Sequence, residues 1–294
     1  MSLREEALAL HRENHGKIEV VSKVPVRDSR ELSLAYSPGV AEPCKEIAKD
    51  PDLSYEYTNR GNMVAVVSDG TAVLGLGDIG PEAGLPVMEG KAILFKNFAD
   101  IDAFPICLGT KKVDEVIQAV KWLEPTFGGI NLEDISGPRC FEIEEKLKAA
   151  MSIPVFHDDQ HGTAVVCVAA LWNALRVVGK DIAKIKLVVN GAGAAGISIA
   201  KLLIASGVAP ANVSICDRKG LLFPGMNPNN LHMESMARLT NSEGRRGTLA
   251  EVLTGADVFI GVSAANIVTA EMIKSMAPHA IIFAMANPAP EIMP

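Results

Sequence analysis

The feature that most constrains this chain is a glycine-rich turn between a predicted strand and a predicted helix. The segment Asn190 to Gly196 reads Asn-Gly-Ala-Gly-Ala-Ala-Gly, follows the apolar run Ile185 to Val189 and leads into the apolar run Ile197 to Ile204. Glycines at this spacing allow a tight turn, a close approach of backbone to a bound pyrophosphate, and close packing of helix on sheet. The segment therefore predicts a dinucleotide site at the N-terminus of a helix.

An acidic residue completes this fingerprint. A second predicted strand, Val213 to Cys216, ends in Asp217, about 20 residues beyond the glycines, where the acceptor for an adenosine ribose hydroxyl is expected. A carboxylate there repels a 2′-phosphate and favours NAD, whereas Arg218 and Lys219 are suited to pair with the extra phosphate of NADP. We expect NAD, with NADP as the alternative. The predicted cofactor-binding residues here are Gly191, Ala192, Gly193, Ala194, Ala195, Gly196 and Asp217.

Composition narrows the class of protein. The chain has 294 residues, of which 48% are hydrophobic and 21% charged, with a net charge of −7; this is typical of a compact two-domain α/β protein. The absence of a long Lys/Arg run argues against a nucleic-acid partner. No signal peptide and no apolar run of roughly 18 residues is evident, so we expect a cytoplasmic protein with no membrane partner. Five scattered cysteines predict neither disulfides nor a thiolate metal site.

Strand and helix patterns alternate along most of the chain, which favours an α/β fold with a mainly parallel sheet in each half. We predict an N-terminal α/β domain over 1–160 and a Rossmann-like, doubly wound NAD(P)-binding domain over 161–294. An Asp-Gly pair lies within Ser68 to Thr71, between the apolar runs Met63 to Val67 and Val73 to Leu76, and predicts a hairpin. The segment Gly77 to Pro86 is rich in Gly and Pro and predicts a loop. The predicted later strands are Ala103 to Leu108, Gly129 to Leu132, Ile153 to Phe156, Lys186 to Val189, Val213 to Cys216, Val258 to Val262 and Ile281 to Ala284.

Two carboxylate pairs stand where predicted strands end: Glu133-Asp134 and Asp158-Asp159. The carboxyl ends of parallel strands line the ligand crevice of an open sheet, so both pairs are candidates to converge on Mg²⁺ or Mn²⁺. From spacing alone, solvated surface acids are an equally open interpretation. The four-residue spacing of His157 and His161 suggests a zinc site, but His157 ends a strand and Gly162 is expected to interrupt before the helix, which argues against it.

Three further side chains are candidates for chemistry. Lys91 precedes an apolar run, so its ammonium group either faces a cleft as an acid–base group or lies exposed on a helix. Tyr36, before Ser-Pro-Gly, is either a functional hydroxyl or a packing residue at a turn. Asn287 follows the last predicted strand and either holds a substrate carboxylate or the nicotinamide, or simply starts an Asn-Pro turn.

Five motifs in order resemble malic enzymes of the bacterial type. They are Tyr36-Ser-Pro-Gly-Val40, Ser68-Asp-Gly-Thr-Ala-Val-Leu-Gly-Leu-Gly-Asp78, Leu85-Pro-Val-Met-Glu-Gly-Lys91, Asn131-Leu-Glu-Asp134 and Phe156-His-Asp-Asp-Gln-His-Gly-Thr163. The resemblance implies oxidative decarboxylation of L-malate to pyruvate and CO₂, with reduction of NAD or NADP and a requirement for Mg²⁺ or Mn²⁺. It also implies a homodimer or higher homo-oligomer, with the N-terminal helical region as an interface.

The resemblance also assigns roles. Glu133, Asp134 and Asp159 match the family's metal ligands. Lys91 matches the acid–base lysine, Tyr36 the general-acid tyrosine, Asp158 the carboxylate beside the lysine, and Asn287 an asparagine at the substrate and nicotinamide.

The chain departs from the family in two places. Ala72 stands where eukaryotic-type enzymes carry a substrate-binding arginine, so substrate contacts must come partly from elsewhere. The sequence also stops at Pro294, where the family continues through further elements, and we expect uncovered sheet edge and apolar surface to reduce stability and activity. The alternatives are a non-catalytic or weakly active dinucleotide- or malate-binding fragment, or another Rossmann-type dehydrogenase that needs no carboxylate cluster.

Overall fold

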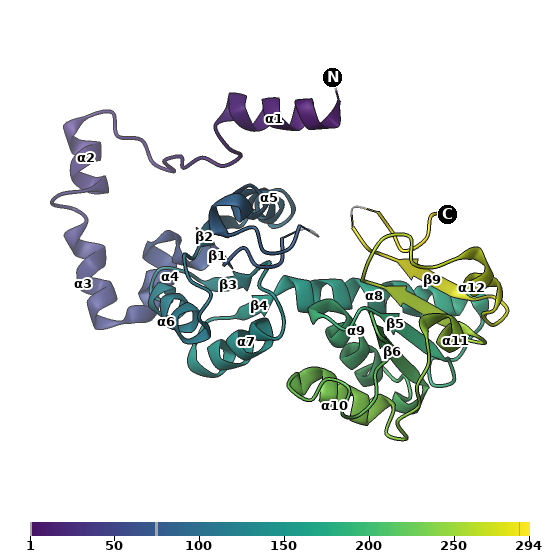
Figure 1. Ribbon diagram of the computed structural model, residues 1–294. Coiled ribbons are helices and arrows are strands. Elements are labelled where there is room, and N and C mark those ends of the chain that lie inside the picture. The colour runs from purple at the N-terminus through teal and green to yellow at the C-terminus, as the bar shows by residue number, and fades with distance from the viewer. Residues whose placement is uncertain (1, 74–75, 288) are drawn as a thin grey trace. The chain divides into compact units, whose positions relative to one another are not determined.

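The computed structural model describes residues 2–73, 76–287 and 289–294. The chain divides into two compact units (Figure 1). Unit 1 comprises Met1–Thr71, Ile79–Glu133 and Glu145–Val155, and unit 2 comprises Ala72–Asp78, Asp134–Glu144 and Phe156–Pro294. The chain thus crosses between units several times around residue 72–78 and residue 134–144, as well as near residue 156.

The sheet of the N-terminal half has four strands in the order β2-β1-β3-β4. These are β1 (Met63–Ser68), β2 (Asp102–Cys107), β3 (Gly129–Leu132) and β4 (Val155–His157). β1 is parallel to both β2 and β3, which confirms the predicted parallel sheet. The crossover helices are α5 (Pro81–Ala99), α6 (Val113–Leu123) and α7 (Arg139–Ala150). Met88 and Ala92 of α5 pack against Val66 and Ala103 in the core.

The predicted hairpin at Asp69-Gly70 does not form. Both edges of β1 are already occupied by parallel partners, so no antiparallel strand can pair with it. Val73 instead forms an isolated bridge with Gly77, and residues 74 and 75 of the predicted second strand lie outside the described residues. The predicted loop over residues 77–86 is also shorter than expected, because α5 begins at Pro81, a position where a missing N–H costs nothing.

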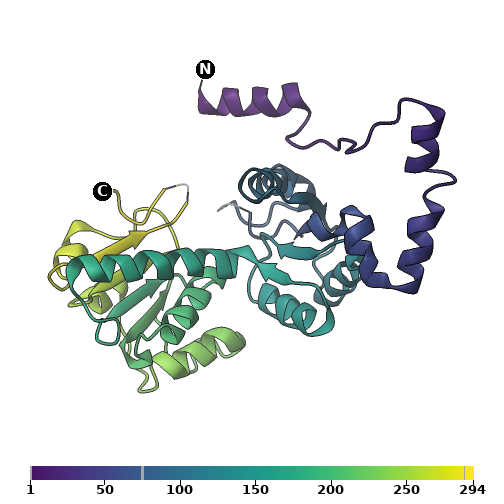
Figure 2. The same ribbon diagram turned by 180° about the vertical axis from the view of Figure 1, so that it is seen from behind.

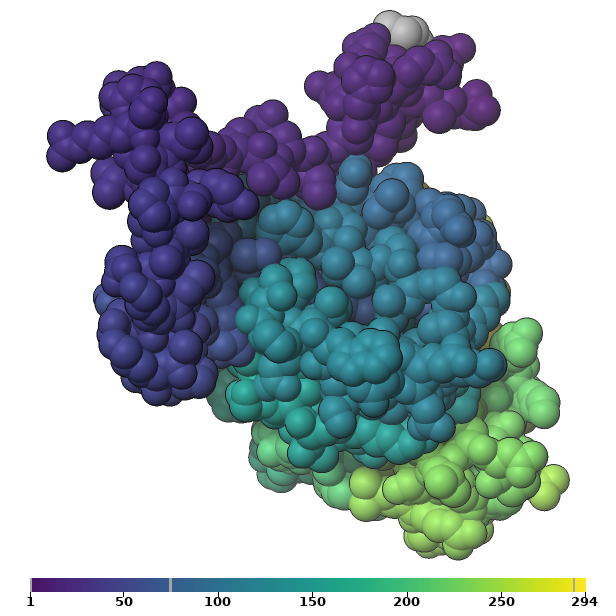
Figure 3. Space-filling view, turned by 90° about the vertical axis from the view of Figure 1, so that its left-hand side faces the viewer, coloured from purple at the N-terminus to yellow at the C-terminus, as the bar shows by residue number. Residues whose placement is uncertain are grey.

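The first 62 residues bury no side chain among those described. They contain α1 (Leu3–Asn14), α2 (Ser29–Ala35), α3 (Ala41–Lys49) and α4 (Ser54–Tyr57), with 3₁₀ turns at Pro51–Leu53 and Asn59–Asn62. Apolar side chains such as Val20, which is 84% exposed, and Leu34, which is 69% exposed, face outward. In Figure 3 this segment is coloured from purple to dark blue and lies at the surface of the face shown. Such a run of exposed apolar residues is characteristic of a surface that another molecule covers.

Unit 2 contains a five-stranded sheet in the order β7-β6-β5-β8-β9. Its strands are β5 (Leu187–Asn190), β6 (Val213–Asp217), β7 (Gly220–Leu221), β8 (Val258–Gly261) and β9 (Ile281–Ala284), all parallel except β7. Helices pack on both faces of the sheet (Figures 1 and 2). They are α8 (Asp158–Val178), α9 (Ala194–Ala205), α10 (Leu231–Thr240), α11 (Leu249–Leu253) and α12 (Ala270–Lys274), with a 3₁₀ turn at Pro210–Asn212. The predicted Rossmann-like fold is confirmed.

Helix α8 is, among the described residues, long and apolar enough to cross a membrane by length and composition alone. Of its most apolar 18 residues, 22% are buried in the structure. In this structure α8 packs along α9 and buries Ala164, Cys167 and Leu171. Among the cysteines, Cys140, Cys167 and Cys216 are buried and Cys44 is exposed, and burial raises the pKa of both Cys140 and Cys216 to about 12.

Asp102, the first residue of β2, has a carboxylate that accepts several side-chain hydrogen bonds. Its carboxylate accepts hydrogen bonds from Asn59, Lys96 and Asn62, and these bonds, that of Asn59 first, hold the pKa of Asp102 well below its usual value. A depressed pKa in the folded state stabilises the fold above the unfolded-state pKa of about 4, and the stabilisation is lost as the pH falls through the folded pKa.

We therefore expect Asp102→Asn to lower the free energy of unfolding by about 2 kcal/mol at pH 7. The difference in the free energy of unfolding between this variant and the wild-type chain should become smaller as the pH is lowered below about 4. Urea unfolding at a series of pH values measures it, with the exposed Asp52 changed to asparagine as the control. A difference that stays constant down to the lowest pH would contradict this role.

Candidate active site

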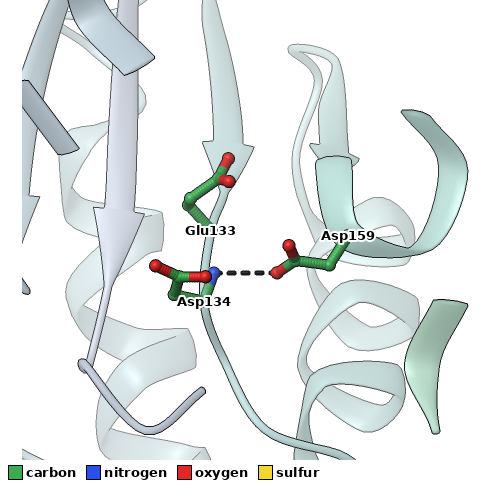
Figure 4. Close-up of side chains that lie close together, drawn as sticks. All are labelled: Glu133, Asp134 and Asp159. Carbon is green, nitrogen blue, oxygen red and sulfur yellow. Dashed lines mark hydrogen bonds between the residues drawn. The ribbon is translucent and has the colours of Figure 1, made fainter. Parts of the chain in front are cut away.

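Three carboxylates come together at the end of β3. Glu133 and Asp134 directly follow β3, and Asp159 lies in the first turn of α8. One carboxylate oxygen from each lies within 4.8 Å of the others (Figure 4). Glu133 and Asp134 are each only 5% exposed. The predicted convergence of the two acidic pairs thus holds for these three side chains.

The backbone at Asp134 explains how neighbouring residues share one site. Successive side chains of a strand point to opposite faces, but Asp134 has a φ of 53°, in the left-handed region that aspartate tolerates better than most residues. Its backbone N–H donates to Asp159 Oδ2 over 2.8 Å, and its carbonyl accepts from the backbone N–H of Ala72. The turn is therefore fixed from both sides.

The side chain of Lys91 contacts this cluster and is not exposed on the surface of its helix. Its Nζ lies 3.2 Å from Glu133 Oε1, and its side chain is 22% exposed. The other oxygen of Glu133 accepts a hydrogen bond of 2.8 Å from Asn131 Nδ2. Asn131 was not among the predicted site residues, although a polar residue two positions before Glu133, on the same face of a buried strand, was the available signal.

The cluster fits a hard divalent cation. Carboxylate oxygens are the ligands that Mg²⁺ and Mn²⁺ prefer, and three carboxylates this close repel one another unless positive charge neutralises them. Glu133, Asp134 and Asp159 are the residues that would hold the ion.

The remaining predicted catalytic residues are placed differently. Asp158 is the first residue of α8, and the helix continues through Gly162 instead of starting after it as predicted. A side chain at Gly162 would come within 2.2 Å of Asp158 Oδ1, so the missing Cβ leaves room for this carboxylate. Tyr36 follows α2 and is 69% exposed.

The two histidines of this region are not arranged as a zinc site. His157 is fully buried at the start of α8, with its Nδ1 3.9 Å from Asp159 Oδ2. Burial lowers the pKa of His157, which favours the neutral ring. His161 Nε2 lies 2.7 Å from Glu144 Oε1. Neither belongs to a metal-binding group among the described residues.

The glycine-rich turn has the predicted geometry. Gly191 has a φ of +123°, and a Cβ on Gly196 would lie 1.6 Å from the carbonyl oxygen of Gly191, so a side chain fits at neither position without a shift. A Cβ on Gly193, in contrast, would meet nothing within 4 Å. The backbone at Gly193 is therefore open to a ligand, at the N-terminus of α9.

A cavity of about 850 Å³ opens over this turn. Asn190, Gly191, Ala192 and Gly193 line it at the end of β5, and Asp217 lines it at the end of β6. Asp217 Oδ1 accepts a hydrogen bond of 2.7 Å from the backbone N–H of Lys219. The cavity lies across the carboxyl ends of the strands, where a doubly wound sheet binds a dinucleotide. The predicted residues Ala194, Ala195 and Gly196 are in the first turn of α9 and do not line it.

Asn287 lies beyond β9 and is exposed. The segment that carries it is attached through a residue that the sequence did not indicate: Glu291, fully buried, accepts a hydrogen bond from the backbone N–H of Ala286.

Comparison with known proteins agrees with this geometry. Residues 15–148 match the malic enzyme N-terminal domain, and residues 160–292 match the malic enzyme NAD-binding domain. A bifunctional malic/malolactic enzyme of Bacillus subtilis is 62% identical over 100% of this chain, which spans 72% of that protein. An NADP-dependent malic enzyme of Salmonella typhimurium is 53% identical over 99% of this chain, which spans 38% of it.

A solved structure shows the same fold. The crystal structure of an NAD-dependent malic enzyme from Thermotoga maritima superposes with a TM-score of 0.93 and 54% identity, covering 98% of this chain and 76% of that one. With both halves matched in order and the acidic cluster and dinucleotide cavity in place, the chain belongs to the malic enzyme family.

Proposed function

We propose that the chain catalyses the oxidative decarboxylation of L-malate to pyruvate and CO₂ with reduction of NAD or NADP. The observation that carries this proposal is the ion pair between Lys91 and Glu133, because Glu133 also belongs to the acidic cluster. An acid–base group beside a cation site is what the reaction requires: malate must lose its hydroxyl proton, and the enolate left after CO₂ departs must gain a proton.

In this proposal Lys91 exchanges protons with the substrate. Glu133 holds the Lys91 ammonium group through one carboxylate oxygen, and its other oxygen accepts a hydrogen bond from the Asn131 amide. Glu133, Asp134 and Asp159 would hold a Mg²⁺ or Mn²⁺ ion, which would supply positive charge to stabilise the alkoxide and enolate oxygens. Tyr36 is proposed as the general acid, and Asp158 as the carboxylate that tunes Lys91.

We propose NAD as the preferred cofactor, with NADP as the alternative. Asp217 lines the cavity, and its carboxylate accepts hydrogen bonds from the Lys219 N–H and from the Asn227 side-chain amide. In this proposal the carboxylate binds a ribose hydroxyl and places negative charge where a 2′-phosphate would lie. Arg218 and Lys219 line the same cavity and are the side chains that would accommodate NADP. Asn287 is proposed to contact the substrate and the nicotinamide.

The test is formation of the reduced cofactor from L-malate, with NAD and with NADP, in the presence and absence of Mn²⁺. We expect metal-dependent turnover, faster with NAD, that falls about a thousandfold in Lys91→Ala. Lys96→Ala is the matched control, because Lys96 lies on the same helix and also pairs with carboxylates. Cofactor binding without turnover would instead favour a non-catalytic fragment, and turnover without added metal would favour another type of dehydrogenase.

We further propose a cytoplasmic homodimer or higher homo-oligomer, in which the N-terminal segment, residues 2–62, packs on a second copy. The exposed apolar side chains of this segment support the proposal. Sedimentation velocity should show an oligomer that dissociates when Val20 and Val21 are both changed to aspartate. Val177→Asp is the control, since Val177 is 86% exposed but lies in unit 2. A monomeric wild-type chain would contradict the proposal.

A further inference from the structure

Glu291 is a buried carboxylate without a cationic partner in the part of the chain that the structure describes. Its side chain is fully buried, and removal of a charge from water is costly unless hydrogen bonds compensate for it. The compensation comes from three donors: the backbone N–H and hydroxyl of Ser263 at 2.8 and 3.1 Å, and the backbone N–H of Ala286 at 3.0 Å. Gly261 makes room, because a Cβ there would lie 2.3 Å from Glu291 Cδ.

These donors belong to two segments at the carboxyl ends of neighbouring strands. Ser263 follows β8, and Ala286 follows β9. Ser263 also accepts a hydrogen bond of 2.8 Å from Asn190 Nδ2, at the end of β5. One carboxylate thus links, directly or through Ser263, the ends of three adjacent strands.

Two of the linked residues line the dinucleotide cavity. Asn190 and Ser263 line it, while Asp217 lies at the end of β6, on the other side of β5 in the strand order. With the pyrophosphate at the glycine-rich turn and the adenosine ribose at Asp217, the nicotinamide half of the cofactor extends toward β8 and β9. Asn287, the residue proposed to contact it, directly follows Ala286.

We propose that Glu291 is a positioning residue for the nicotinamide half of the cofactor site. It fixes the segments that carry Ser263 and Asn287, and has no role at the adenosine half. This assignment rests on the proposed function of the cavity as an NAD(P) site, but it does not require that the chain turn over malate.

The test compares binding of NADH with binding of ADP, which lacks the nicotinamide half. In Glu291→Gln the amide presents an N–H group to one of the donors, so we expect NADH affinity to fall about tenfold while ADP affinity changes by less than about twofold. Glu291→Asp, which keeps the charge but is one methylene shorter, should show the same selective loss. Fluorescence titration measures NADH, and isothermal titration calorimetry measures ADP.

Asp257→Asn is the matched control. Asp257 also accepts a backbone N–H, from Lys186, and pairs with Lys180, but it lies at the opposite end of β8 and does not line the cavity. It should lower the melting temperature and leave both affinities unchanged. Equal weakening of NADH and ADP in the folded Glu291 variants, or no change in either, would overturn the positioning role. Failure of the wild-type chain to bind either nucleotide would overturn the proposed function itself.

Discussion

Replacement of Asp159 by asparagine is expected to lower kcat/KM for malate by a factor on the order of a thousand and to abolish detectable Mn²⁺ binding. Asp159 contributes one of the three oxygens that lie within 4.8 Å, and the same carboxylate accepts the backbone N–H of Asp134. An asparagine oxygen preserves that hydrogen bond but removes the negative charge that attracts the cation. The loss should therefore appear in metal binding while the fold is retained.

Calorimetric titration with Mn²⁺ and steady-state kinetics measure this effect. Asp114→Asn is the control, because Asp114 also lies in the first turn of a helix but its side chain is 91% exposed. Unchanged Mn²⁺ affinity in Asp159→Asn would contradict the role of Asp159 as a metal ligand.

Substitution of Gly196 by alanine is the second change with a large expected effect. The new Cβ would lie 1.6 Å from the carbonyl oxygen of Gly191, so the turn must open or α9 must move away from β5. Because the clash is with backbone, no side-chain rotation relieves it. We expect the free energy of unfolding of unit 2 to fall by about 3 kcal/mol and cofactor binding to be lost.

Gly193→Ala separates the two roles of the turn. A Cβ at Gly193 meets nothing within 4 Å, so this variant should unfold like the wild-type chain and still bind NADH poorly, since the methyl group enters the space over the backbone. Thermal unfolding and NADH fluorescence measure both variants. Wild-type melting and NADH affinity in Gly196→Ala would contradict the packing role assigned to this glycine.

Local patterns predicted most of the fold. The strands β3 and β9 begin and end at the predicted residues. A short continuous apolar run bounded by turn residues is typical of a buried strand, and its two ends define the length of that strand. The prediction failed at Asp69-Gly70, where a strong hairpin signal was overridden by the parallel partners on both sides of β1. It also placed the start of α8 too late, since Gly162 is tolerated inside a helix when a neighbouring carboxylate occupies the space of its missing side chain.

By itself, the sequence determined the chemistry available to this protein: a glycine-rich turn after a strand, an acid at the end of the next strand, and two acidic pairs with a candidate lysine. These are local patterns, and their physical constraints act within a few residues. Only the tertiary structure decided how the three carboxylates singled out by the family resemblance meet, through the left-handed turn at Asp134 and its bond to Asp159, and that Lys91 pairs with Glu133. It also decided that Glu291 is buried, because burial depends on elements distant in sequence that no local pattern specifies.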